Sequence, residues 1–131
     1  MSRVSGLPVL AVIALLVYTI STSGFEDPSE PKDAAEFVRR GNDSYSKGKI
    51  DEAIKDYTEA LRLNPKSRAA LMNRGRSWAD KDEYDKAIRD YTACIEMDET
   101  NATAFVRRSG CWIEKKDYDK AIADCETAMR L

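Results

Sequence analysis

Few residues in this sequence could perform acid–base or nucleophilic chemistry. Its 131 residues include no histidine, which removes the commonest general base and the commonest metal ligand. The three cysteines, Cys94, Cys111 and Cys125, therefore have no histidine to activate them, and three thiols alone make a poor zinc site. We expect no enzymatic activity, no metal and no cofactor.

The odd number of cysteines also argues against a disulfide framework. Cys94 and Cys125 fall on the apolar faces of predicted helices, where a buried thiol acts as a small hydrophobic side chain. The alternative is one disulfide bond between adjacent helices in an oxidising compartment. The sequence leaves both interpretations open.

A second group of residues has the chemistry of ligand binding. Arginine offers a planar fork that matches a carboxylate, asparagine can hydrogen-bond an extended backbone, and apolar residues can accept side chains. Together they suit an extended peptide that carries an acidic group or a free C-terminus. The predicted peptide-binding residues are Arg39, Asn42, Asn73, Arg76 and Arg107, with Val38, Met72 and Val106 as their apolar neighbours.

These residues are positioned by an internal repeat. The pair Ala87-Ile88 recurs as Ala53-Ile54 and as Ala121-Ile122, a period of about 34 residues. The same period divides the chain into copies at residues 34–67, 68–101 and 102–131, the last one truncated. A period of this length indicates a stacked array of repeats.

Each copy contains two amphipathic helical patterns, so we predict an all-α fold. In the first copy Phe37 and Gly41 mark the inner face of the first helix, and Ala53 and Tyr57 mark that of the second. We expect Gly41 to face Ala53, which would bring the two helix axes close together. We expect Gly48 to end the first helix. We expect Asp51, Asp85 and Asp119 just before the second helices, where an aspartate can accept a hydrogen bond from a free backbone N–H group and also favours the helix dipole.

The repeats resemble the tetratricopeptide repeat family. Its pattern of a large apolar residue, glycine and an aromatic residue, then alanine and an aromatic residue, is matched in the second copy by Leu71, Gly75, Trp78, Ala87 and Tyr91. The resemblance implies a right-handed α-solenoid of helix-turn-helix repeats whose first helices line a concave groove. The departures are Ser44 in place of the first aromatic residue, Ser109 in place of the glycine, Cys125 in place of the second aromatic residue, and Glu99 in place of the proline that closes the family's repeat.

The resemblance also implies a protein-interaction module. Some members of the family hold the C-terminal carboxylate of heat-shock chaperones in a five-residue clamp, and Asn42, Asn73 and Arg107 coincide with three of its positions. Val38 and Thr103 stand where the clamp has lysines, so this clamp is partial. We expect the groove to bind a protein or peptide partner. The alternative is an assembly scaffold, a homo-oligomer that associates through its C-terminal repeat.

Each copy also places an arginine sixteen residues before an aspartate. In a hairpin that turns midway between the two, both side chains lie at the same level. The first interpretation is a structural ion pair, and the second is a charged binding stripe. The pairs are Arg40 with Asp56, Arg74 with Asp90, and Arg108 with Asp124.

The N-terminus carries an apolar leader. Residues Leu7–Ile20 contain no charge, Arg3 precedes them, and small residues follow, which is typical of a signal peptide cleaved before Gly24. An uncleaved membrane anchor, a short transmembrane helix, is the alternative. We assign residues 1–23 to this leader and 24–33 to a linker, and expect the repeats on the non-cytoplasmic side, exported or membrane-anchored. The net charge of −2 gives no indication of nucleic-acid binding.

Overall fold

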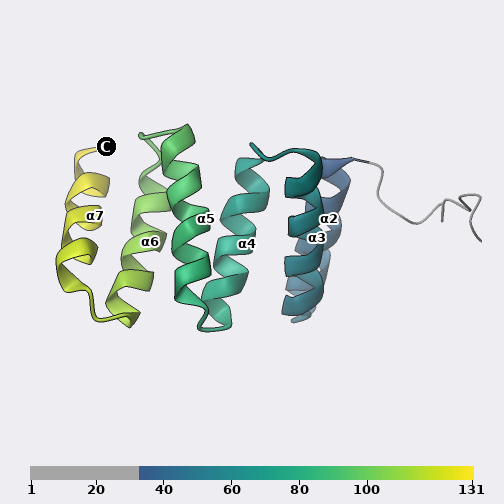
Figure 1. Ribbon diagram of the computed structural model, residues 1–131, viewed down its shortest axis with the longest axis horizontal. Helices are drawn as coiled ribbons and strands as arrows, with labels where there is room; N and C mark the ends of the chain where they lie inside the picture. Colours follow the sequence, from purple (N-terminus) through teal and green to yellow (C-terminus); the bar gives the residue numbers. More distant parts are fainter. Residues whose placement is uncertain (1–32) are drawn as a thin grey trace, which may run out of the picture. The chain divides into compact units, whose positions relative to one another are not determined.

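The computed structural model describes residues 33–131, and within that range the chain is all-helical (Figure 1). The predicted leader at residues 1–23 and nearly all of the linker lie outside the described residues. The helices are α2 (Ala34–Ser46), α3 (Ile50–Leu63), α4 (Arg68–Asp80), α5 (Tyr84–Met97), α6 (Ala102–Glu114) and α7 (Tyr118–Arg130).

Consecutive helices pack as hairpins that stack along the chain, which confirms the predicted α-solenoid. The pairs α2–α3, α4–α5 and α6–α7 form the hairpins, and α3 against α4 and α5 against α6 join them (Figure 1). The first helices also meet one another, α2 with α4 and α4 with α6. No such contact joins α3 to α5 or α5 to α7 within residues 33–131. The first helices therefore form the inner side of the array.

Side chains that precede the first helices cap their free N–H groups. Asp33 Oδ1 accepts a hydrogen bond of 2.8 Å from Glu36 N at the start of α2. Ser67 Oγ accepts one of 3.3 Å from Ala70 N, and Asn101 Oδ1 one of 3.1 Å from Ala104 N. These caps recur at the repeat period and satisfy backbone donors that the helix itself leaves unpaired.

The predicted capping role of Asp51, Asp85 and Asp119 is wrong. The second helices begin at Ile50, Tyr84 and Tyr118, so these aspartates lie inside the first turn, where their charge still favours the helix dipole as predicted. Three residues suffice for each hairpin turn, and the helix starts earlier than the apolar pattern suggested. Asp51 and Asp85 instead accept hydrogen bonds from Lys81 and Lys115, each in the following repeat.

The hairpin turns each contain one residue with a left-handed backbone. Gly48 has φ +74°, which confirms its predicted role at the end of the first helix. The equivalent residues of the other copies are Asp82 and Lys116, with φ of 60° and 62°. A side chain at this φ is strained, so the second and third turns hold a conformation that glycine adopts more readily.

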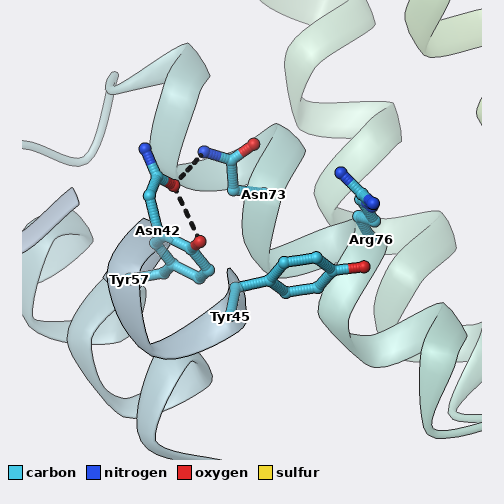
Figure 2. Close-up of a pocket in the computed structure, with 5 residues that line it drawn as sticks. All are labelled: Asn42, Tyr45, Tyr57, Asn73 and Arg76. Carbon is cyan, nitrogen blue, oxygen red and sulfur yellow. Dashed lines mark hydrogen bonds between the residues drawn. The ribbon is translucent and has the colours of Figure 1, made fainter. Parts of the chain in front are cut away.

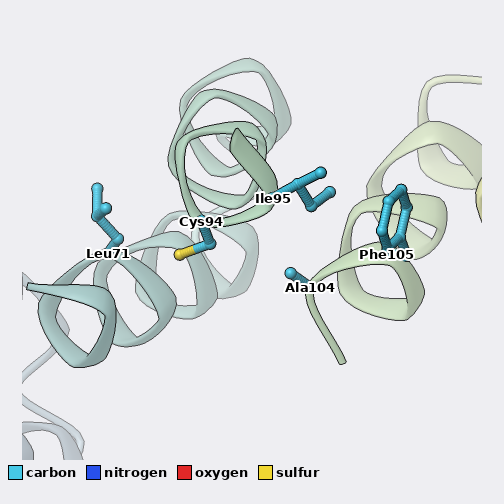
Figure 3. Close-up of a cluster of buried hydrophobic side chains, with 5 residues drawn as sticks. All are labelled: Leu71, Cys94, Ile95, Ala104 and Phe105. Atoms are coloured by element: carbon cyan, nitrogen blue, oxygen red, sulfur yellow. The ribbon is translucent and has the colours of Figure 1, made fainter. Parts of the chain in front are cut away.

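Buried apolar residues link each hairpin to the next helix. In Figure 3, Leu71 of α4 and Cys94 and Ile95 of α5 gather with Ala104 and Phe105 of α6. Cys94 is fully buried, and its Sγ atom lies 3.9 Å from the carbonyl oxygen of Arg68. Burial raises the pKa of the Cys94 thiol to about 11, which keeps it protonated at neutral pH. Cys94 thus acts as a small hydrophobic residue.

The other two cysteines differ from expectation in their burial. All three thiols are free. Cys111 is buried, although only Cys94 and Cys125 were predicted on packing faces. Cys125 is half-buried, because in the part of the chain that the structure describes no helix packs over the outer face of α7.

The close contact within the first hairpin involves a tyrosine. A Cβ atom on Gly41 would stand 2.6 Å from Tyr57 Cε1, and one on Gly75 would stand 2.8 Å from Tyr91 Cε1. The three nearest atoms all belong to Tyr57, so the closest contact of Gly41 is with the tyrosine ring and not with the predicted Ala53. The third copy changes both partners together, with Ser109 and Cys125 at these positions.

The structural ion-pair interpretation is confirmed in all three copies. Asp56 accepts hydrogen bonds from Arg40 Nε at 3.1 Å and from Arg40 Nη2 at 2.7 Å. The pairs Arg74–Asp90 and Arg108–Asp124 have the same bidentate geometry. The carboxylates are buried, so these pairs hold α2 to α3, α4 to α5 and α6 to α7 from inside the hairpins.

Candidate functional site

The predicted site residues lie on the helices of the inner side, with different degrees of exposure. Arg39, Arg76 and Arg107 are exposed on α2, α4 and α6, and Val106 is 55% exposed. Val38 packs against the core cluster around Phe37, and Met72 packs against buried clusters on both sides of it. Of the three apolar residues, Val106 is therefore the one fully available to a ligand.

One pocket on this side brings three of the predicted residues together. It has a volume of about 280 Å³ and lies where α2 and α4 meet. Asn42, Asn73 and Arg76 line it, together with Tyr45 and Tyr57 (Figure 2). Arg39 and Arg107 do not line this pocket, although both are on the same helices.

Two hydrogen bonds fix the orientation of Asn42. Its Oδ1 atom accepts from Tyr57 Oη at 2.8 Å and from Asn73 Nδ2 at 2.8 Å. Figure 2 shows both bonds converging on this oxygen, with Asn42 Nδ2 and Asn73 Oδ1 directed away from the junction. In this arrangement the amide of Asn42 presents its oxygen to both donors. One donor group and one acceptor are left for a ligand.

Tyr57 supplies its hydrogen bond as a neutral phenol. Its side chain is almost completely buried, and burial raises its pKa to about 12. Tyr57 was predicted as a packing residue and missed as a site residue. The signal for it was chemical, because the hydroxyl of a buried tyrosine usually finds a hydrogen-bond partner.

The cationic side of the pocket is Arg76 stacked on Tyr45. The guanidinium carbon of Arg76 lies 4.4 Å from the centroid of the Tyr45 ring. The Tyr45 hydroxyl donates a hydrogen bond to Asp80, which fixes the far edge of the ring. Burial and this carboxylate raise the pKa of Tyr45. Among the described residues, Arg76 has no carboxylate at ion-pair distance, so its charge is available.

The pocket chemistry changes at the next repeat junction. The positions of Asn42, Tyr57 and Asn73 are taken there by Arg76, Tyr91 and Arg107. Burial raises the pKa of Tyr91, and the nearby charge of Arg107 opposes this. The inner surface therefore runs from a neutral amide pair near α2 to two arginines near α6. Such a surface offers amide hydrogen-bonding groups at one end and guanidinium donors for carboxylates at the other.

Residues 33–131 contain no group of three or more acidic or cysteine side chains placed to hold a metal ion. None of the helices α2–α7 has the length and apolar composition needed to cross a bilayer. The predicted membrane anchor at residues 7–20 lies outside this range.

Comparison with solved structures gives relatives of the same architecture. The second TPR of Spaghetti (RPAP3) bound to the HSP90 peptide SRMEEVD aligns with a TM-score of 0.73 at 27% identity, covering 76% of this chain and 93% of that one. The second TPR domain of human RPAP3 in complex with the HSP70 peptide SGPTIEEVD aligns with a TM-score of 0.70 at 27% identity, covering 73% and 80%. The Arabidopsis OM64 TPR domain gives 0.70 at 27% identity, covering 73% and 79%.

Comparison of the sequence alone gives the same result at the level of the family. No curated protein matches this chain. The sequence profile described as tetratricopeptide repeat matches residues 38–102 and, in an overlapping second match, residues 79–131. Together the two matches cover both hairpin junctions and most of the chain. The chain belongs to the tetratricopeptide repeat family.

Proposed function

We propose that this chain is a protein-interaction module that binds an extended acidic peptide segment along α2, α4 and α6. The observation that carries the proposal is the fixed amide pair beside a free cation. Asn42 is held by Asn73 and Tyr57, each at 2.8 Å, and Arg76 lies across the same pocket.

The amide pair suits a peptide backbone. Asn42 Nδ2 can donate to a peptide carbonyl or carboxylate, and Asn73 Oδ1 can accept from a peptide N–H group. Both amides are already oriented by the protein, so little side-chain freedom is lost when a ligand binds. Arg76 and Arg107 add charged hydrogen-bond donors, which bind carboxylates more strongly than neutral donors do.

The related structures support the acidic character of the ligand. The peptides named for the two RPAP3 domains both end in Glu-Glu-Val-Asp. This chain has Asn42, Asn73 and Arg107 at three positions that the family uses for such a terminus. Val38 and Thr103 replace two lysines there, and Val38 is turned partly into the core. Arg76 supplies a cation at a position outside this clamp. We therefore expect the chain to bind acidic peptides, with a sequence preference that differs from that of a complete clamp.

Calorimetric titration with the peptide SRMEEVD tests the proposal. Charged hydrogen bonds contribute about 1.5–3 kcal/mol each, so Arg76→Ala/Arg107→Ala should weaken binding by about two decades or more. The matched control is Lys47→Ala/Lys115→Ala, which also removes two positive charges. Lys47 pairs with Asp43 near the first hairpin turn, and Lys115 pairs with Asp85 of the preceding repeat. If the double lysine substitution abolishes binding and the double arginine substitution does not, the peptide does not bind in this groove.

We further propose that residues 1–23 direct export or anchor the chain, as their apolar pattern predicts. The two outcomes differ in mass. Cleavage before Gly24 removes residues 1–23, and an anchor retains them. Mass spectrometry of the protein isolated from its native membrane and soluble fractions distinguishes them, and a full-length chain in the cytoplasmic fraction contradicts both.

A further inference from the structure

The outer face of α7 exposes residues whose equivalents are buried or half-buried in the other repeats. Ile122 is 57% exposed, against 7% for Ile54 and 8% for Ile88. Met129 is 79% exposed, against 9% for Ile95. These side chains line a hollow of about 410 Å³ together with Cys125 and Glu126. A contiguous apolar face of this kind marks an interaction surface.

The interior junctions show what such a face binds. The equivalent face of α5 is covered by α6, through Ala104 and Phe105 (Figure 3). Two basic residues of α6 complete the contact. Arg108 Nη1 donates to Thr92 Oγ1 at 2.9 Å, and Lys115 pairs with Asp85. The junction of α3 with α4 repeats this pattern, with Arg74 donating to Thr58 and Lys81 pairing with Asp51.

The face of α7 keeps the acceptors of this pattern. Asp119 is equivalent to Asp85, and Glu126 is equivalent to Thr92, so a neutral acceptor is replaced by a carboxylate. Both are exposed, and within residues 33–131 neither has an ion-pair partner. A carboxylate binds arginine more strongly than a hydroxyl does. The face therefore combines an apolar centre with two acidic groups spaced for basic residues.

We propose that the outer face of α7 binds an amphipathic helix of a partner protein, with basic residues two helical turns apart. The helix carries a small residue and a large apolar residue side by side, then an arginine, a second small residue and a lysine. Their spacing is that of Ala104, Phe105, Arg108, Cys111 and Lys115. Its arginine bonds Glu126, its lysine bonds Asp119, and its apolar residues cover Ile122 and Met129.

Head-to-tail stacking of a second copy, with its α2 on α7, is disfavoured. Its α2 helix carries Phe37, Arg40 and Lys47 at the matching positions, but Glu36 and Asp43 stand where the small residues belong. The interior equivalents of Glu36 are Ala70 and Ala104, both completely buried. Stacking α2 on α7 would bury Glu36 and Asp43, which pair with Arg39 and Lys47, near the acidic Glu126. Removing these carboxylates from water beside a third one is costly.

Peptide binding to the full 131-residue chain tests the proposal. The probe is a fluorescent peptide of residues 102–116 with a hydrocarbon staple between positions 106 and 110, because a free helix of this length is marginal in water. The matched control is residues 34–48, stapled between positions 38 and 42. We expect the first peptide to bind at least about tenfold more tightly, because each buried carboxylate costs more than about 1.4 kcal/mol.

Substitutions on the chain identify the surface. Ile122→Lys should weaken the 102–116 peptide at least about tenfold, whereas Leu63→Lys, at another exposed apolar residue, should not. Asp119→Lys should weaken it about twofold to fivefold, as for an exposed pair, and Lys115→Glu in the peptide should restore it.

Three results would overturn the proposal. Equal binding of the two peptides removes the requirement for small residues. Binding that is insensitive to Ile122→Lys places the peptide elsewhere, for example on α5 in exchange for α6. A concentration-dependent dimer in sedimentation that Ile122→Lys abolishes makes a second copy the occupant. None of these results bears on the inner pocket, because Asn42, Asn73 and Arg76 lie on other helices.

Discussion

The ring of Tyr57 lies against the backbone of Gly41, where a Cβ atom would stand 2.6 Å from Cε1. From this position the tyrosine hydroxyl reaches Asn42 Oδ1 at 2.8 Å. A glycine inside the first hairpin thus sets the position of an amide in the pocket between α2 and α4. Packing and the geometry of the proposed binding site are coupled at this point of the array.

Substitution of this glycine should destabilise the protein. Gly41→Ala forces the added methyl group against the Tyr57 ring, and overpacking of this kind costs about 1–3 kcal/mol. Urea unfolding measures the change. The matched control is Gly110→Ala in α6, where no atom lies within 4 Å of the new Cβ and the change should stabilise by about 0.4–1 kcal/mol. Equal changes in the free energy of unfolding at both positions would show that the close contact between Gly41 and Tyr57 does not determine stability.

The hairpin turns give a second pair of matched substitutions. Lys116 has φ 62°, a left-handed backbone that costs a residue with a side chain about 1–2 kcal/mol. Lys116→Gly should therefore raise the free energy of unfolding by up to about this amount. Gly48→Lys, at the equivalent turn with φ +74°, should lower it by a similar amount. If both changes act in the same direction, the turn conformations do not control stability.

The buried ion pair predicts non-additive substitutions. Arg74→Leu alone leaves Asp90 buried without its partner, which costs about 3–5 kcal/mol. In the background of Asp90→Leu the same change should cost clearly less, because no unpaired charge remains. A double-mutant cycle from chemical unfolding gives the coupling energy. Additive effects would contradict the bidentate geometry.

Stability should fall in alkaline solution. Burial raises the pKa of Tyr57 from 10 to about 12 and that of Cys111 from 9 to about 11. Above about pH 9 the unfolded chain loses protons that the folded chain retains, so the free energy of unfolding decreases as pH rises. Below about pH 8 these groups do not make the free energy of unfolding depend on pH. Tyr57→Phe should make the loss above pH 10 less steep in urea unfolding, and an unchanged slope would show that Tyr57 ionises freely.

The repeat period predicted those features that depend only on which face of a helix a residue occupies. It gave the stacked hairpins, the pairing of Arg40 with Asp56 and the inner-side position of Asn42 and Asn73. Spacing in the sequence does not show how far a side chain reaches or which repeat supplies its partner. The bond from Lys81 to Asp51 crosses a repeat junction, and the Tyr57 hydroxyl emerges from the core into the pocket. Neither contact follows from the spacing of residues along the chain.

The change of two residues in the third copy illustrates the same limit. Ser109 and Cys125 each depart from the family pattern. From the sequence alone, each would be expected to weaken a packing contact independently of the other. In the structure their equivalents, Gly75 and Tyr91, touch each other, so a larger residue on one helix accompanies a smaller one on the other. The departures form one compensated exchange.

Nuclear magnetic resonance of the side-chain amides tests the central claim most directly. Asn42 and Asn73 each carry an Nδ2 group whose signals report on the pocket itself. Titration with SRMEEVD should shift both amide signals and the Arg76 Nε signal saturably, with one dissociation constant, and added salt should weaken the binding. Shifts confined to α7 or to the outer helices α3 and α5, with Asn42 and Asn73 unchanged, would contradict the proposed peptide-binding groove.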